Sequence, residues 1–223
     1  MRREDGSITY QNYFQILEAI SLVYTKVVEI ANYSYLQAKD VSSYLSMLED
    51  IGFVRKEHSV LDKRRIRGTY RMKDNFFEFW FRFILRYYSE IETWEIEGAW
   101  SDFKREFNSY LGFTFEKIAM EFLVEKKPFN FQKIGRWWHR DKEIDLVALN
   151  EGTKEMAFFE VKWSDLGIEE ARRILTELEG KSKFVDWNKR ERQEHFGLIA
   201  KRLEGKEKLK EEGCYDLEDI QKE

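Results

Sequence analysis

Apolar positions in the first third of the chain recur three and four residues apart, the spacing at which side chains line one face of a helix. The pattern predicts three short helices, around residues 14–20, 27–31 and 41–51. Asp40 is placed to cap the third helix. Gly52 is placed to end it, because glycine accepts the left-handed backbone that often follows a helix.

Two strand-like runs follow these helices, over residues 53–60 and 66–72. The polar residues 62–65, Asp-Lys-Arg-Arg, separate the two runs and predict the turn of a hairpin. Three helices followed by a hairpin is the order of elements in a winged helix-turn-helix domain. We therefore expect such a domain over residues 10–73.

The next segment, residues 76–88, is rich in aromatic side chains. It falls well short of the roughly 18 apolar residues of a membrane span, because it is interrupted by Glu78, Arg82 and Arg86. Asp74 is placed to cap a long helix that runs to about Ile91, and a second helical stretch is expected near residues 100–107. We expect residues 74–108 to form an aromatic helical connector that packs between the domains or exposes a patch for another chain.

After the connector the pattern changes to a helix, three strands, a helix and a fourth strand. The first helix has Phe115 and Leu123 on its apolar face, and Pro128 follows it. The three strands, the second helix and the fourth strand are expected over residues 131–138, 142–149, 155–162, 169–181 and 196–200. The order αβββαβ predicts a mixed sheet flanked by helices over residues 109–223, and hence an α/β protein of two domains.

Charged residues stand in two of these strands where a buried strand is normally apolar. A hairpin turn centred on the dipeptide 152–153 places Asp145 opposite Glu160, and Glu143 opposite Lys162. Side chains alternate between the two faces of a strand, so all four project from one face of the sheet. Carboxylates and an ammonium grouped in this way are costly unless a metal or a substrate uses them.

These elements and residues resemble the PD-(D/E)XK nuclease superfamily, which has the restriction-endonuclease-like fold. Asp145 matches the Asp of the motif, the tripeptide 160–162 (Glu-Val-Lys) matches Glu-X-Lys, and Glu116 matches the Glu supplied by a helix. Ile144 stands where the superfamily has its Pro. The resemblance implies a hydrolase that cuts phosphodiester bonds. In it Asp145 and Glu160 bind Mg²⁺ or Mn²⁺, Glu116 supports them, and Lys162 assists the attacking water.

The chemistry of Mg²⁺ agrees with these residue types, because it prefers hard oxygen ligands and commonly takes one or two protein carboxylates. The same residues are also compatible with cross-strand ion pairs on a solvated face of the sheet. The apolar neighbours Phe158, Phe159 and Val161 make free solvation of the carboxylates less favourable. The sequence therefore favours a nuclease-like fold, and leaves open whether its site is catalytic.

The net charge of −4 provides no overall attraction to nucleic acid, so DNA binding requires local patches. Residues 55–73 hold eight lysines and arginines against two acidic residues, as a DNA-contacting wing would. A contact surface for protein is the alternative, because the third helix exposes few side chains suited to reading bases. The residues expected to contact nucleic acid are Lys63, Arg64, Arg65, Arg67, Arg136 and Arg140. Between the last two, Trp137 and Trp138 suit either base stacking or the core.

The tripeptide 180–182, Gly-Lys-Ser, is not expected to bind ATP or another nucleotide cofactor. A phosphate-binding loop needs a glycine where Leu175 stands, and it follows a strand instead of ending a helix. Cys214 is the only cysteine, which excludes an intramolecular disulfide and favours a reducing compartment. With no apolar stretch after Met1, a cytoplasmic protein without membrane contact is expected.

The combination of a winged helix, the aromatic run at residues 74–83 and the nuclease-like module resembles the C-terminal region of archaeal AAA+/STAND-type ATPases. In that family a P-loop ATPase domain precedes the winged helix, so the resemblance implies such a domain as a partner in cis or in trans. The sequence would then be a fragment or the product of a split gene. The expected function is a Mg²⁺-dependent DNA endonuclease module of an ATPase system. The alternative is a non-catalytic DNA-binding or regulatory module.

Overall fold

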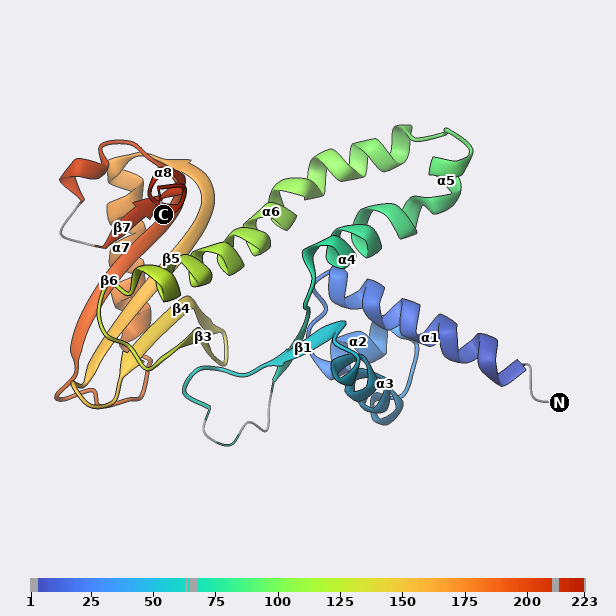
Figure 1. Cartoon of the computed structure of the whole chain (residues 1–223), viewed down its shortest axis with the longest axis horizontal. Helices are drawn as coiled ribbons and strands as arrows, with labels where there is room; N and C mark the ends of the chain where they lie inside the picture. Colours follow the sequence, from blue (N-terminus) through green and yellow to red (C-terminus); the bar gives the residue numbers. More distant parts are fainter. Residues whose placement is uncertain (1–3, 63, 65–67, 210–212, 223) are drawn as a thin grey trace. The chain divides into compact units, whose positions relative to one another are not determined.

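The computed structural model describes residues 4–62, 64, 68–209 and 213–222 (Figure 1). The chain divides into two compact units. Unit 1 comprises residues 1–58 and 64–107, and unit 2 comprises residues 59–63 and 108–223. Three residues expected to contact nucleic acid lie outside the described residues, namely Lys63, Arg65 and Arg67.

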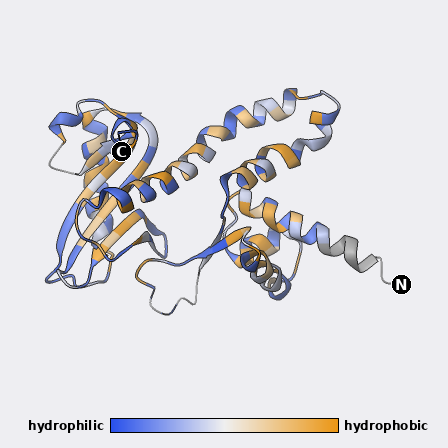
Figure 2. Ribbon diagram, viewed as in Figure 1, coloured by the Kyte–Doolittle hydropathy of each residue, from blue (hydrophilic) through white to orange (hydrophobic). Residues whose placement is uncertain are grey.

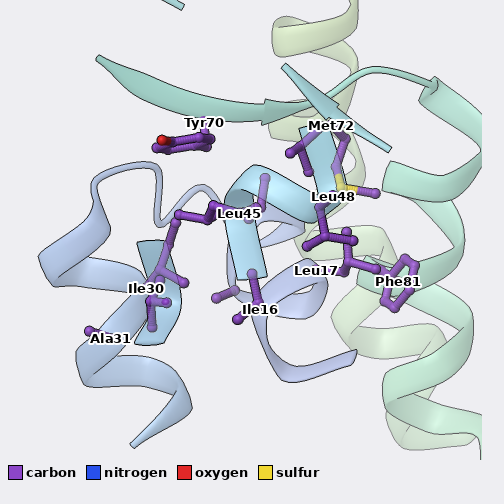
Figure 3. Packing of buried hydrophobic residues seen from close by; sticks show 13 residues of the cluster. Ile16, Leu17, Ile30, Ala31, Leu45, Leu48, Tyr70, Met72 and Phe81 are labelled. Carbon is purple, nitrogen blue, oxygen red and sulfur yellow. The ribbon is translucent and has the colours of Figure 1, made fainter. Parts of the chain in front are cut away.

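Unit 1 contains the predicted order of three helices followed by a two-stranded antiparallel sheet. These elements are α1 (Glu4–Ser21), α2 (Val27–Ser34), α3 (Ala38–Asp50), β1 (Val54–Glu57) and β2 (Thr69–Met72). Their apolar faces meet in one core around Ile16, Ile30 and Leu45, which Met72 of β2 closes (Figure 3). Each of these four side chains is at most 1% exposed. The spacing of apolar residues identified the buried faces in part, because Phe14, Val28 and Ile51 are 44%, 64% and 58% exposed.

Helix α3 has a different N-cap from the predicted one, whereas its C-terminal end agrees with the prediction. The N-cap is Gln37, and Asp40 lies inside the first turn of the helix. A carboxylate there is still favourable, because the first turn exposes backbone N–H groups and carries the positive end of the helix dipole. Gly52 follows the helix with a φ of +83°, a left-handed conformation that favours glycine, as predicted.

The aromatic segment is helical, but its helical geometry changes along its length. Asp74 caps it as predicted, accepting a hydrogen bond from the backbone N–H of Phe76 at 2.7 Å. The successive elements are α4 (Asn75–Phe79), a π-helical turn (Trp80–Ile84), a 3-10 turn (Leu85–Tyr87) and α5 (Tyr88–Glu92). Phe81 and Phe83 are buried within unit 1, where the Phe83 ring lies 5.2 Å from that of Phe103.

Helix α6 (Glu97–Lys126) is continuous, although the sequence predicted separate helical stretches around residues 100–107 and before Pro128. The residues between them include no proline, and Gly112 alone costs only about 1 kcal/mol in a helix interior. The boundary between the two units falls inside this helix, between residues 107 and 108. It lies one residue from the predicted start of the second domain.

Unit 2 is built on a five-stranded mixed sheet of order β3-β4-β5-β6-β7. Strand β4 pairs antiparallel with both β3 and β5, whereas β6 is parallel to β5 and β7 is parallel to β6. The strands are β3 (Lys133–His139), β4 (Lys142–Asn150), β5 (Glu155–Leu166), β6 (Gln193–Leu203) and β7 (Cys214–Asp216). The remaining elements are α7 (Ile168–Ser182), a 3-10 turn (Lys206–Lys208) and α8 (Leu217–Ile220). The αβββαβ order and the mixed sheet are confirmed, while β7 was not predicted because three residues give no detectable alternation.

The two faces of this sheet are covered by different helices. Phe115 and Leu123 of α6 pack with Leu146, Phe159 and other residues on one face. On the opposite face, Leu178 of α7 packs with Phe158, Val147 and their neighbours. Hydrophobic and hydrophilic residues alternate along these helices (Figure 2). This pattern is expected for a helix that packs one face against a sheet and exposes the other.

The segment after β1 belongs to unit 2, although residues 53–60 were predicted as one strand. The backbone N–H of Val60 donates to the carbonyl oxygen of Arg136 at 2.9 Å, and the N–H of Trp138 donates to Ser59 Oγ at 3.4 Å. Val60 also packs against the cluster that contains Trp137. These contacts cover the free edge of β3, beside a β-bulge between Gly135 and Trp137.

Candidate active site

Strands β4 and β5 pair in the predicted register. Their ladder runs from Asn150↔Glu155 to Leu146↔Phe159, and the next positions along the two strands are Asp145 and Glu160. The strands part here, and Oδ2 of Asp145 accepts a hydrogen bond from the backbone N–H of Val161 at 2.9 Å. The end of the ladder therefore brings these two carboxylates together.

Glu160 is the most deeply buried charged group of this site, with 3% of its surface exposed. Lys162 Nζ lies 2.7 Å from Oε2 of Glu160 and 3.5 Å from Oδ2 of Asp145. The other carboxylate oxygen of Glu160, Oε1, accepts a hydrogen bond from Lys181 Nζ at 2.5 Å. The site thus consists of two carboxylates and two ammonium groups supplied by β4, β5 and α7.

Lys181 was not among the residues that the sequence assigned to this site. The only prediction for the tripeptide 180–182, which contains it, was that it does not bind a nucleotide. A usable signal is present, because Lys181 stands three residues after Leu178, which α7 buries against the sheet. Residues three apart share a helix face, so the Lys181 side chain is directed toward the strand that carries Glu160.

The electrostatics of the site follow from burial and from the opposing charges. Burial, together with the negative charge of Asp145, raises the pKa of Glu160 although Lys162 and Lys181 act in the opposite direction. Burial alone would lower the pKa of Lys162, but Asp145 and Glu160 outweigh it and raise that pKa. Lys162 is therefore a charged ammonium at neutral pH, suited to orienting a group or neutralising negative charge and not to accepting a proton.

Glu116 of α6 lies in a different local cluster from the two carboxylates. It forms an ion pair with Arg136, whose guanidinium is also 3.7 Å from Glu143. Glu143 pairs in the backbone with Trp138 of β3 and has a largely exposed side chain, so the expected partnership with Lys162 is not formed. In the described part of the chain, no three Asp, Glu, His or Cys side chains form a group able to hold a metal.

The described residues of the expected nucleic-acid surface differ in their surroundings. Arg136 is half-buried and its charge is balanced by glutamates. Arg140 is exposed in the tight turn between β3 and β4, with a φ of +57°. Arg64 is also exposed. Trp137 is 4% exposed and belongs to the core, whereas Trp138 is half-buried.

The donor set of the site fits a small hard cation. Asp145 and Glu160 both present carboxylate oxygens within 3.5 Å of the same ammonium, so they converge on a common region. Magnesium commonly takes only one or two protein carboxylates and completes its shell with water and substrate oxygens. Asp145 and Glu160 are therefore the two residues that could hold Mg²⁺ or Mn²⁺ without a third acidic side chain.

The chain is similar to proteins whose own functions are not described. Residues 80–174 match the family DUF234, "Archaea bacterial proteins of unknown function", and the matched region contains Glu116, Asp145, Glu160 and Lys162. The chain is 40% identical over 218 residues to the uncharacterized protein MJECL04 of Methanocaldococcus jannaschii. The alignment covers 93% of this chain but 48% of that relative, so the chain spans about half the relative's length. No solved structure matches the chain.

Among the residues that the structure describes, no helix is both long and apolar enough to cross a membrane. This agrees with the charged interruptions noted in the aromatic segment.

Proposed function

We propose that the chain is a Mg²⁺-dependent DNA endonuclease module in which unit 2 has a restriction-endonuclease-like fold. The observation that carries the proposal is the convergence of Asp145, Glu160 and Lys162 where β4 and β5 part. The order αβββαβ around a mixed sheet supports the same fold. Three helices followed by an antiparallel hairpin support a winged helix for unit 1.

Asp145 and Glu160 would hold the cation. A bound divalent cation stabilises negative charge on a phosphate and lowers the pKa of a coordinated water. The Val161 N–H fixes one oxygen of Asp145, and the two lysines fix the carboxylate of Glu160. Lys162 supplies a positive charge that orients the attacking water or neutralises the phosphate in the transition state. Glu116 pairs with Arg136, so any contribution it makes to the reaction is indirect.

The nucleic acid would be held by positive side chains outside the acidic pair. Arg64 and Arg140 are exposed, and the three residues Lys63, Arg65 and Arg67 add positive charge to the same sequence region as Arg64. Contacts of this kind are to phosphates, so they bind DNA without reading its sequence.

The alternative is a non-catalytic DNA-binding or regulatory module. It is favoured by one specific observation, the pairing of both oxygens of Glu160 with ammonium groups. Two carboxylates and two ammoniums balance one another, so the site is internally neutral without a cation. In this version the charged groups stabilise the end of the β4–β5 ladder, and unit 1 provides the interaction surface.

An ATPase domain, in cis or in trans, is the proposed partner in both versions. The relative's additional length supports it, because this chain corresponds to 48% of that protein. Unit 1 also has an apolar groove of about 550 Å³ between α1, α3 and α4, suited to receiving another protein surface. Its rim includes side chains that are half or more exposed: Tyr10, Met47, Ile51 and Phe76.

The test of the proposed function is a cleavage assay on single-stranded, duplex and branched DNA with Mg²⁺ or Mn²⁺. Asp145→Asn removes a metal-binding charge while keeping a side-chain oxygen for the Val161 N–H. We expect it to lower cleavage by about 100-fold or more, as loss of a central electrostatic group does. The matched control is Asp141→Asn in the exposed turn before β4. Equal activity of the two variants would show that the assigned site does not cut DNA.

A further inference from the structure

Lys181 connects helix α7 to the acidic pair, and it contacts a different oxygen of Glu160 from the one that Lys162 contacts. It stands in the last turn of α7, its side chain is 32% exposed, and its Nζ lies 2.5 Å from Oε1 of Glu160. Lys162 occupies the other oxygen, Oε2, at 2.7 Å. The two lysines therefore hold opposite oxygens of one buried carboxylate.

The two lysines do not have equivalent positions. Lys162 is two residues from Glu160 on the same strand and also faces Asp145, so it is tied to the strand that forms the site. Lys181 reaches Glu160 across the interface between α7 and the sheet, with a flexible four-carbon stem. Its removal changes the charge beside Oε1 while leaving the contacts of Lys162 and Asp145 in place.

A divalent cation that binds Glu160 through Oε1 must compete with the Lys181 ammonium. Both are positive, so they repel one another, and they share one oxygen as partner. The charges of Asp145, Glu160, Lys162 and Lys181 sum to zero. Without Lys181, the remaining three groups carry a net charge of −1. The lysine therefore opposes cation binding both by its contact and by its charge.

We propose that Lys181 is a positioning residue of this site that holds Oε1 of Glu160 and thereby sets a low affinity for divalent cations. The inference rests on the proposed function, because it assigns Glu160 to the cation. A purely structural ion pair has a different consequence. Removal of Lys181 would then lower stability, and it would leave cation affinity unchanged.

The experiment is calorimetric titration of the full chain with MgCl₂ and, separately, MnCl₂. We expect Lys181→Gln to bind either cation roughly tenfold more tightly than the wild type, given the strength of charge interactions near a protein surface. Lys181→Arg keeps the charge and is expected to keep the weak affinity. The matched control is Lys183→Gln, an exposed lysine two residues away, which is expected to behave as wild type. Lys181→Met, which keeps the aliphatic stem, takes the place of Lys181→Gln if thermal melting shows that the latter is unfolded.

The double variant Glu160→Gln with Lys181→Gln shows whether the gained affinity belongs to Glu160, and it is expected to lose that gain. If Lys181→Gln binds the cation no more tightly than wild type, the inference is overturned while the metal site of the proposed function stands. If affinity rises as expected but no variant or wild type cuts DNA, the inference stands and the proposed endonuclease is wrong. Absence of cation binding in every variant would overturn both.

Discussion

The backbone N–H of Val161 donates a hydrogen bond to Oδ2 of Asp145, 2.9 Å away, where strands β4 and β5 stop pairing. The carboxylate takes the place of the backbone carbonyl that a continued ladder would have supplied. One side chain therefore both ends the ladder and fixes the position of a charged group. The acidic pair is thus a product of strand pairing and not of a flexible loop.

This relationship predicts different stabilities for two substitutions of Asp145. Asp145→Ala leaves the Val161 N–H without its acceptor, and we expect a loss of about 1–3 kcal/mol in the free energy of unfolding. Asp145→Asn keeps an acceptor oxygen and is expected to lose less. Urea denaturation measures both, with Asp141→Ala as the control at an exposed position. Equal stabilities of Asp145→Ala and Asp141→Ala would contradict the structural role of the hydrogen bond.

The adjacent tryptophans of β3 are predicted to serve different purposes. Trp137 is 4% exposed and packs between the sheet and its covering residues, so Trp137→Ala should cost about 3–5 kcal/mol of stability. Trp138 is half-buried, and Trp138→Ala should cost clearly less. Denaturant titration gives the stabilities, and a DNA-binding titration tests Trp138 for base stacking. A destabilisation by Trp138→Ala as large as that by Trp137→Ala would overturn this division.

Glu116 is predicted to contribute less to activity than Asp145. The structure pairs it with Arg136, so Glu116→Gln leaves the contacts of the acidic pair in place. We expect a loss of cleavage below about tenfold, against about 100-fold for Asp145→Asn. Glu121→Gln, at an exposed position on the same helix, is the control.

A double-mutant cycle tests the Glu116–Arg136 pair independently of activity. Unfolding free energies of Glu116→Gln, Arg136→Gln and the double variant should give a coupling of about 0.5–3 kcal/mol, as contacting residues do. No coupling would mean that the ion pair does not hold Arg136.

The cleavage assay has its own contradicting outcome. A loss of cleavage by Glu116→Gln as large as that by Asp145→Asn would place Glu116 in the acidic pair after all.

The register of β4 and β5 was predictable because it depends on local features. A short turn and alternating apolar residues allow few pairings, and the pairing centred on residues 152–153 is the observed one. The burial of Leu146 and Phe159 on the opposite face from Phe158 follows directly from that register. The acidic pair could therefore be assembled from sequence alone.

Contacts between distant elements were not predictable in the same way. Lys181 reaches Glu160 only because α7 crosses back over the sheet, and Glu116 meets Arg136 only through the packing of α6 on β3. Ser59 and Val60 were predicted as the end of a strand over residues 53–60. In the structure the backbone N–H of Val60 bonds to β3 at a bulge, which no local pattern indicates.

The C-terminal cluster of Lys206, Asp216 and Asp219 predicts a pH dependence of stability. Burial alone would raise the pKa of Asp219. Hydrogen bonds from Lys206 Nζ and from the Asp216 N–H outweigh burial and lower that pKa. A lowered pKa in the folded state stabilises the fold above the unfolded value of about 3.9. That contribution is lost as the pH falls through the lower, folded value.

Lys206 determines how the same cluster's contribution to stability changes at high pH. Burial alone would lower the pKa of Lys206, but the nearby carboxylates of Asp216 and Asp219 outweigh burial and raise that pKa. Its contribution is present below the unfolded value of about 10.4 and disappears as the pH rises through the higher folded value. Thermal melting from pH 2 to 11 should show Lys206→Gln approaching the wild type at both extremes and falling below it between them. The control is Lys208→Gln, at an exposed position, and a constant difference at every pH would contradict the linkage.

The basic hairpin is predicted to bind DNA through phosphates. Replacing Arg64, Arg65 and Arg67 together by Gln should weaken binding to every DNA sequence and reduce the salt slope by about one counterion per lost phosphate contact. The control replaces Arg172 and Arg173, which are exposed on α7, by Gln. Binding is measured by fluorescence anisotropy with labelled duplexes of two unrelated sequences over a range of salt concentrations. Unchanged affinity and slope in the triple variant would remove the hairpin from the DNA surface. A loss confined to one of the two duplexes would instead indicate base reading, because phosphate contacts do not depend on sequence.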